Sequence, residues 1–186
     1  MPISDISFDD SCSGSLISPR HVITAAHCVT NYDSEKVAKE CRGSLHGYVP
    51  STINPEIFKV YIGTFCNHPE ECQRPRRVKK SNLYNSHTQK HDFAILELQK
   101  YVYEDEAIPV CLPSRKFRLA KVLSGAGAGK DSEAEDPGLK VARLSLYREE
   151  HEHRNIITSS TDASACGVSK ISFQKGKVLR FITFTK

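Results

Sequence analysis

Hydrophobic and polar residues alternate along most of this chain, and this period of two is the pattern of half-buried β-strands. The pattern predicts strands at residues 15–17, 21–24, 58–64, 93–98, 121–123, 139–146, 155–158 and 178–183. Turn-forming clusters at 18–20 and 136–138 separate such segments, and only residues 33–40 favour a short helix, with Asp33 as its N-cap. Many short strands without alternating helices predict an all-β barrel or sandwich.

The overall composition limits the kinds of partner. The chain has 186 residues, enough for one domain of ordinary size, and 26 Lys+Arg against 22 Asp+Glu give a net charge of +4. This excess is small and spread along the sequence, so it does not indicate a nucleic-acid-binding protein. No apolar run approaches the roughly 18 residues that span a bilayer. We therefore expect neither a nucleic-acid nor a membrane partner, and we expect a monomer.

Seven cysteines are more than a protein of this length in a reducing compartment usually contains, and their odd number leaves at least one unpaired within the chain. Zinc is the main alternative, but no Cys-x-x-Cys pair occurs, and His68 between Cys66 and Cys72 lies in a segment typical of an exposed loop. Disulfides, no metal site and an extracellular, secreted location are therefore expected. Residues 1–5 lack the basic start of a signal peptide, so export would use another route or the true beginning is missing.

Residues 12–28 read CSGSLISPRHVITAAHC, with His27 directly before Cys28. A bridge from Cys12 to Cys28 would hold the imidazole in place, as general-base catalysis requires, although a histidine in such a position is by itself more often structural. The segment closely resembles the histidine-bearing segment of the chymotrypsin-like (trypsin family) serine proteases. This resemblance implies that Cys12 and Cys28 are bridged and that His27 is the base of a catalytic triad.

A second segment, HDFAILEL at residues 91–98, resembles the family's strand that carries the triad aspartate. By itself it reads as a buried strand with an acid at its solvent end. Asp92 follows His27 in the order His, Asp, Ser recorded for chymotrypsin. A carboxylate entering an apolar barrel also needs a partner such as an imidazole N–H. The resemblance therefore implies that Asp92 orients His27.

Three more segments follow in the family's order, namely IPVCLP at 108–113, LSGAG at 123–127 with Ala126 in place of the usual Trp, and LKVARL at 139–144. The resemblance covers about residues 12–146. It implies a chymotrypsin-like double antiparallel β-barrel in a single peptidase S1-like domain, residues 1–186. Residues 1–115 would form the first barrel, and residues 116–186 an incomplete second barrel with a divergent tail at 167–186.

The remaining cysteines have no assigned partners. The two implied triad positions lie 65 residues apart, which is long for the family, and this interval contains Cys41, Cys66 and Cys72. They are expected to mark a loop insertion with its own disulfide, which looks like those of nematode members of the family. Cys111 and Cys166 lack the partners that the family provides, so each could be free or intermolecular.

The third family signature, Cys-x-Gly-Asp-Ser-Gly-Gly, is not matched. Counting from Cys166, Lys170 occupies the place of the nucleophilic serine and Val168 the place of the first glycine. Ser169 is one residue out of register, which in an extended loop turns its hydroxyl away from the base. An ammonium at Lys170 has no route to an acyl-enzyme paired with a histidine. Ser164 stands at the floor of the implied specificity pocket, so a preference for Lys or Arg is not expected.

Three interpretations follow. The first is a serine endopeptidase homologue, acting on proteins or peptides by class but inactive as given because the nucleophile is missing. The second is a non-catalytic pseudoprotease that binds a protein partner. The third is a fragment or mispredicted product of an active enzyme, because eleven residues precede Cys12 and 20 follow Cys166, both short of the family's extent.

Other motifs favour ordinary structural roles. Residues 124–131, SGAGAGKD, approach a phosphate-binding loop but lack its first glycine and its Ser or Thr, and Asp131 would repel phosphate. The basic run at 74–80 is typical of a solvated loop, with polyanion binding or a proteolytic nick as alternatives. His151 and His153 are expected to be exposed rather than metal ligands. No cofactor and no metal are predicted.

Overall fold

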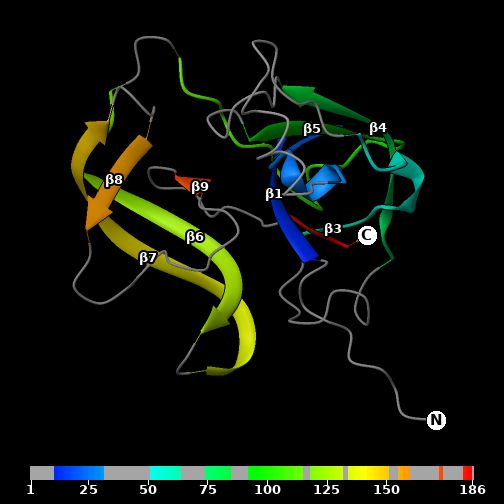
Figure 1. The fold of residues 1–186 in the computed structure, drawn as a ribbon. Helices are drawn as coiled ribbons and strands as arrows, with labels where there is room; N and C mark the ends of the chain where they lie inside the picture. Colours follow the sequence, from blue (N-terminus) through cyan, green and yellow to red (C-terminus); the bar gives the residue numbers. More distant parts are fainter. Residues whose placement is uncertain are drawn as a thin grey trace.

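The computed structural model describes residues 11–31, 51–63, 74–84, 92–114, 118–131, 134–150, 155–159, 172–173 and 182–185. They form a closed six-stranded barrel and a four-stranded sheet, which lie side by side in Figure 1. The predicted all-β class, with a first barrel and an incomplete second one, is confirmed. Within the described residues, no helix is long and apolar enough to cross a membrane.

The barrel is built in the order β1-β10-β3-β4-β5-β2, and each pair of neighbours is antiparallel. Its strands are β1 (Ser11–Ser18), β2 (His21–Thr24), β3 (Lys59–Ile62), β4 (Arg76–Tyr84), β5 (Phe93–Leu98) and β10 (Ile182–Thr185). The strands predicted at 21–24 and 93–98 are confirmed residue for residue. β3 is shorter than the predicted 58–64, since Gly63 at its end has a φ of 68°.

The barrel interior follows the period of two that the sequence shows. In β5, Ala94, Leu96 and Leu98 are buried while Phe93 at the strand's start is exposed. Each fully buried Val, Leu or Phe side chain contributes about 1.5–3 kcal/mol relative to leaving it in water. The largest fully buried hydrophobic side chains are Phe58, Leu16, Leu96, Leu98, Val22, Val29, Val60 and Val78.

β1 and β2 approach each other closely at Gly14. A Cβ on this residue would lie 2.7 Å from Cγ1 of Val22 and 2.9 Å from the carbonyl oxygen of Ile23. Any other residue would therefore push the two strands apart. This close approach matters for function because the turn that carries His27 continues directly from β2.

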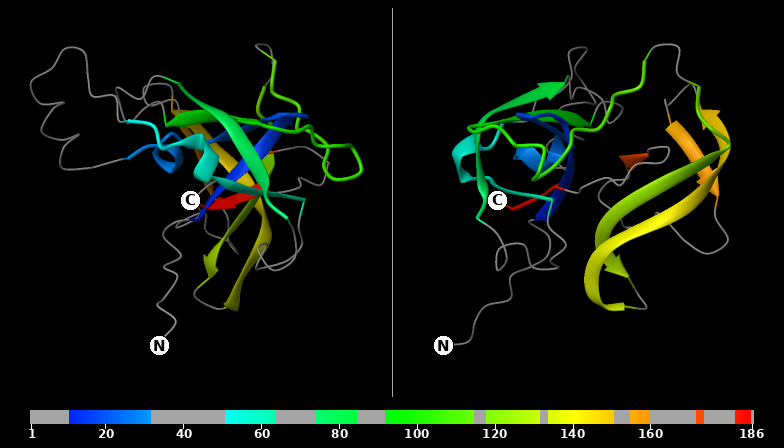
Figure 2. Two further views of the ribbon diagram at one scale, coloured as in Figure 1. Left: turned by 90° about the vertical axis from the view of Figure 1, so that its right-hand side faces the viewer. Right: turned by 180° about the vertical axis from the view of Figure 1, so that it is seen from behind.

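The strand from the C-terminal tail, β10, lies in the barrel. It pairs with β1 from Ser11↔Thr185 to Gly14↔Ile182, and with β3 from Lys59↔Thr185 to Ile62↔Ile182. Both views of Figure 2 show β10 in red beside β1 in blue. The strand predicted at 178–183 overlaps β10 only at residues 182 and 183. The tail that diverges in sequence thus closes the barrel between the first and third strands.

The second sheet has the order β8-β7-β6-β9 and consists mainly of one long hairpin. Its strands are β6 (Val122–Asp131), β7 (Ala134–Glu150), β8 (Asn155–Ser159) and β9 (Ser172–Phe173). β9 also comes from the tail and pairs with β6 at Gly125 and Ala126. The tail therefore contributes one strand to each sheet.

Residues 124–131, whose sequence approaches a phosphate-binding loop, belong to β6, where β7 supplies backbone partners that offset the low strand propensity of a Gly-Ala repeat. One expectation about a turn was wrong. Residues 136–138 lie within β7 instead of a turn. Pro137 is tolerated there because β8 pairs with β7 only from Ser145 onward, which leaves one side of the strand without a ladder among the described residues. The predicted helix at 33–40 lies outside the described residues.

The basic run at 74–80 was also expected to be a loop, and this was wrong. Residues 76–80 belong to β4. Val78 is fully buried between exposed neighbours, and Leu83 further along β4 packs against the core cluster. One buried valine among five cationic residues gives too little alternation of apolar and polar residues to predict a strand.

Candidate active site

His27 begins a single 3-10 turn, His27–Val29, that follows β2 after two buried alanines. The N–H of Cys28 donates to the carbonyl of Ala25 at 3.3 Å, and the N–H of Val29 donates to that of Ala26 at 3.0 Å. Ala25 and Ala26 are both buried. The turn therefore directs Cys28 into the core and leaves His27 at the surface.

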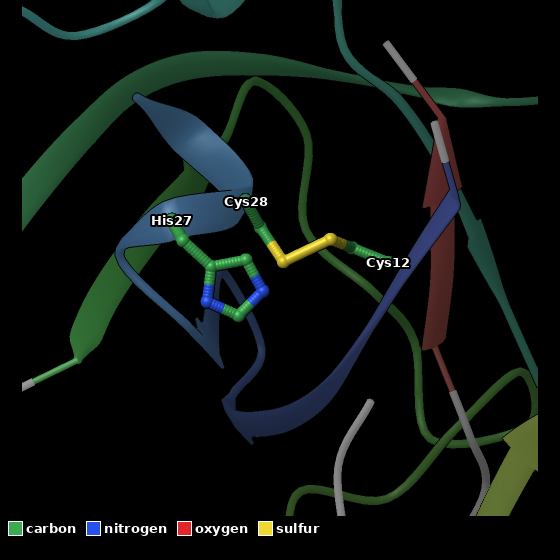
Figure 3. A group of neighbouring side chains, drawn as sticks. All are labelled: Cys12, His27 and Cys28. Carbon is green, nitrogen blue, oxygen red and sulfur yellow. A yellow bond between two sulfur atoms is a disulfide. The ribbon is translucent and has the colours of Figure 1, made fainter. Parts of the chain in front are cut away.

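A disulfide between Cys12 and Cys28 joins β1 to this turn, with the Cα atoms 6.2 Å apart. The pairing implied by the family resemblance is therefore confirmed. Figure 3 shows the His27 ring beside the bridge. A cross-link with a sequence separation of 16 stabilises the fold by about 3 kcal/mol through the lost freedom of the unfolded chain.

Further hydrogen bonds hold the turn on both sides. The Thr24 hydroxyl donates to the Ser13 carbonyl at 2.9 Å, which ties β2 to β1. The Thr30 hydroxyl donates to the Ala26 carbonyl at 3.1 Å, which closes the turn from its other end. The N–H of Ile53 donates to the Val29 carbonyl at 2.9 Å. These hydrogen bonds thus fix the backbone of His27 independently of the contacts that its ring makes.

Asp92 contacts His27 through both carboxylate oxygens. Nδ1 of the ring lies 2.7 Å from Oδ2, and the main-chain N–H of His27 donates to Oδ1 at 2.9 Å. The strand register explains this meeting: Thr24 of β2 pairs with Ala94 of β5, so residues just after β2 lie beside residues just before β5. One carboxylate therefore holds both the ring and the backbone of the same residue.

The pair lies at the surface of the barrel. The His27 side chain is 50% exposed and that of Asp92 is 44% exposed. The expected carboxylate entering an apolar interior is therefore not found, because Asp92 stands before the first residue of β5 and not within it. A neutral ring whose Nδ1–H donates a hydrogen bond to a carboxylate keeps a lone pair on Nε2, which can accept a proton from another group.

The other predicted site residues cannot be placed beside this pair. Ser164, Ser169 and Lys170 lie outside the described residues. Cys41, Cys66, Cys72 and Cys166 do so as well, so their pairing stays open. Cys111 is an exposed free thiol, in line with its lack of a partner in the sequence.

One group in the described part of the chain has ligand atoms close enough for a metal. These atoms, from Cys12, His27 and Cys28, lie within 4.8 Å of one another. Metal binding requires thiolates, and both sulfur atoms are joined in the disulfide. The group is therefore unsuited to a metal as long as the bridge is intact. His68, His151 and His153 fall outside the described residues.

A charged cluster that the sequence did not reveal lies at the other end of β5. Glu97 accepts hydrogen bonds from Arg20 at 2.9 Å and from Lys79 at 3.2 Å. The hydrogen bond from Lys79, together with the positive charges of Lys79, Arg20 and His21, lowers the pKa of the Glu97 carboxyl below its usual value. The partners of Glu97 come from the turn after β1, from β2 and from β4, so only the strand register could have brought them together.

Comparisons with known proteins agree with this arrangement. The family model for trypsin matches residues 3–176. A trypsin from Simulium vittatum is 29% identical over 154 residues, covering 80% of this chain and 53% of that protein. Serine protease 7 of Drosophila melanogaster is 30% identical over 156 residues, covering 77% of this chain and 37% of that protein. The chain thus spans about half the length of the first relative and less of the second.

Solved structures share the fold at lower identity. The scabies mite inactivated protease paralogue S-I1 has a TM-score of 0.60 and 21% identity, covering 94% of this chain and 82% of that chain. Neuropsin, a serine protease of mouse brain, has a TM-score of 0.54 and 17% identity, covering 95% and 88%. At these identities the likeness concerns the fold alone. With the family model spanning nearly the whole sequence, this chain belongs to the trypsin family of serine proteases.

Proposed function

We propose that this chain is a serine endopeptidase homologue in which His27 holds the place of the general base and Asp92 orients it. The observation that supports this most is the pair of contacts from Asp92, at 2.7 Å to Nδ1 and 2.9 Å to the main-chain N–H of His27. In the family reaction, such a base takes the proton of a serine that attacks the peptide carbonyl. The acyl group then passes to water, with protein or peptide as substrate.

We further propose that the chain as given does not complete this reaction. Lys170 stands where the serine is expected, and Ser169 and Val168 replace the aspartate and glycine before it. Removing the nucleophile of a serine protease lowers turnover roughly a millionfold. A protein of this fold described as an inactivated protease paralogue supports this proposal by analogy.

An active-site phosphonate probe tests the second proposal directly. The purified 186-residue chain should remain unlabelled under conditions in which trypsin is labelled completely. Labelling of the chain would overturn the proposed inactivity, and loss of that label in His27→Ala would then identify His27 as the base of an active enzyme.

NMR of the imidazole nitrogens tests the first proposal without relying on activity. The Nδ1 proton of His27 should give a slowly exchanging, low-field resonance that Asp92→Ala removes. Glu97→Ala, which deletes a carboxylate at the opposite end of β5, should leave it unchanged. An unchanged resonance in Asp92→Ala would exclude Asp92 as the orienting group.

The setting and organisation of the chain belong to the same proposal. The disulfide between Cys12 and Cys28 supports an extracellular location. We also propose one domain, 1–186, divided near residue 115 as expected from the sequence, with β10 of the tail added to the first barrel. The relatives named above come from insects, so the nematode likeness of the cysteine-rich insertion stays a prediction.

A further inference from the structure

The geometry points to a second binding site on the barrel, a cleft that takes a linear sulfated polysaccharide. The cleft has a volume of about 780 Å³ and lies where β3 ends and β4 begins. Its polar lining consists of Arg74, Arg76, Arg77, Gln99, Lys100 and Glu106. The inference assumes the proposed extracellular location, where such polymers occur, and is independent of catalysis.

The cleft carries an excess of positive charge. Glu106 is the one carboxylate among the described lining residues. It is neutralised by an ion pair with Arg76, and its second oxygen accepts the N–H of Tyr103 at 3.0 Å. In the part of the chain that the structure describes, no ion pair links Arg74, Arg77 or Lys100 to a carboxylate. Arg77 donates one hydrogen bond, to the Glu56 carbonyl at 3.3 Å, so most of its guanidinium is left for a ligand.

The positive face continues beyond the cleft along β3 and β4. Lys59 is the register partner of Arg77, so the two side chains project from the same face of the sheet. A register shift between Val78 and Lys80 allows Lys79 and Lys80 to be exposed in succession. Arg77 and Lys80 are then about 10 Å apart along the strand. An extended polymer with repeated anions matches such a row better than a single small anion does.

The barrel backbone at this point disfavours a peptide ligand. Arg76 and Arg77 pair with Val60 and Lys59 of β3 on one side. On the other side the Arg77 carbonyl accepts the N–H of Gln99 at 2.9 Å. An added peptide strand needs an open sheet edge, and here the edge is occupied on both sides. Recognition must therefore rely on side-chain charges.

The chemistry of the lining favours sulfate groups over nucleic-acid bases. None of the described residues that line the cleft is aromatic, whereas proteins that bind single-stranded nucleic acid stack bases on aromatic rings. Tyr101, which follows Lys100, has its ring 5.0 Å from the Arg20 guanidinium and is engaged there. Planar guanidinium groups donate paired hydrogen bonds to tetrahedral oxyanions, and lysine adds a point charge.

Heparin affinity measured by calorimetry and by salt elution tests the inference on the full chain. The triple variant Arg74→Ala/Arg77→Ala/Lys100→Ala should bind heparin at least about tenfold more weakly and should lower the slope of log K against log salt by about one for each lost contact. The control Arg118→Ala/Lys121→Ala/Arg143→Ala removes the same charge from exposed positions outside the barrel strands and should change affinity less than twofold. Equal losses of heparin affinity in both triple variants would overturn the proposed site.

Two further measurements keep the test decisive. Desulfated heparin should not bind, and equal or tighter binding of single-stranded DNA or polyglutamate would overturn the assignment to a sulfated polysaccharide. If the triple variant fails to fold, Lys100→Glu, at an exposed position after β5, should weaken heparin binding severalfold, and an unchanged affinity would overturn the proposal. The phosphonate experiment does not involve these residues, so failure of either proposal is seen separately.

Discussion

The barrel and the four-stranded sheet have the same kind of strand but differ in what holds them. The barrel buries a continuous cluster of apolar side chains contributed by all the strands whose side chains are described. Among the described side chains of the sheet, Leu123 and Leu144 are buried, whereas Val141 and Tyr147 are each 71% exposed. The barrel therefore has a core of its own, whereas the described part of the sheet combines the backbone pairing of β6 with β7 with two buried leucines. Residues that must keep a fixed geometry, His27 and Asp92, are attached to the barrel.

Removing β10 should have the largest effect on this difference. A chain ending at residue 177 loses the strand between β1 and β3, whose backbone groups would then lack partners. We expect the barrel to lose its cooperative unfolding transition, as followed by urea titration and hydrogen exchange of β1 and β3. A chain ending at Thr185 is the control and should unfold as the full chain does. If the amides of β1 kept their protection from hydrogen exchange in the chain ending at residue 177, the observed topology would be contradicted.

Removing the disulfide should come next. Cys12→Ala/Cys28→Ala should lower the free energy of unfolding of the barrel by about 3 kcal/mol, since the unfolded chain regains the freedom of the closed loop. Denaturant unfolding followed by barrel-specific amide signals measures this value. Cys111→Ala, which removes a free surface thiol, should change stability by less than about 0.5 kcal/mol.

A matched pair of valines compares the two regions with the same chemical change. Val60 in β3 is 0% exposed and Val141 in β7 is 71% exposed. Val60→Ala should cost about 2 kcal/mol, because it removes buried methyl groups and leaves a cavity, and Val141→Ala less than about 0.5 kcal/mol. Chemical denaturation of both variants gives the comparison. Equal costs would mean that residue 141 is covered in solution.

The smallest expected effect is the pH dependence contributed by Glu97. Its pKa is lowered in the folded chain, so its stabilising contribution is present at neutral pH and is lost as the pH falls below its ordinary value of 4.5 and through the folded-state pKa. The stability difference between the wild type and Glu97→Gln should therefore narrow between pH 6 and about pH 3. In a Lys79→Met background, which lacks the main donor to Glu97, the stability difference caused by Glu97→Gln should change less with pH.

The barrel was more predictable from sequence than the sheet. The side chains of β2 and β5 alternate between buried and partly or fully exposed positions. Both strands were predictable because their apolar and β-branched residues favour extended structure. β6 was missed beyond residue 123 because Gly and Ala carry little strand preference, and only its partner β7 makes it a strand. β4 was missed because its first half, residues 76–80, has one buried apolar residue, Val78, among cationic ones. Pairings between distant segments, such as β10 with β1, leave no local pattern to read.

The site was predictable as far as its residue types and order allow. His27, Asp92 and the Cys12–Cys28 bridge followed from short motifs, and their distances agree with that reading. The contact between Asp92 and the main-chain N–H of His27 could not be predicted, since it depends on the register of β2 with β5. The cluster around Glu97 was missed for the same reason, as its partners are far apart in the sequence.

The position of β10 also has a consequence for biosynthesis. β1 leaves the ribosome before the other described strands. It cannot complete its pairing until residues 182–185 have been translated, and at 5–20 residues per second that takes on the order of ten seconds or more. During this interval the nascent chain exposes the unpaired edges of β1 and β3. Formation of the Cys12–Cys28 disulfide requires only residues 12–28 of the polypeptide. Oxidation can therefore fix the His27 turn long before β10 completes the barrel.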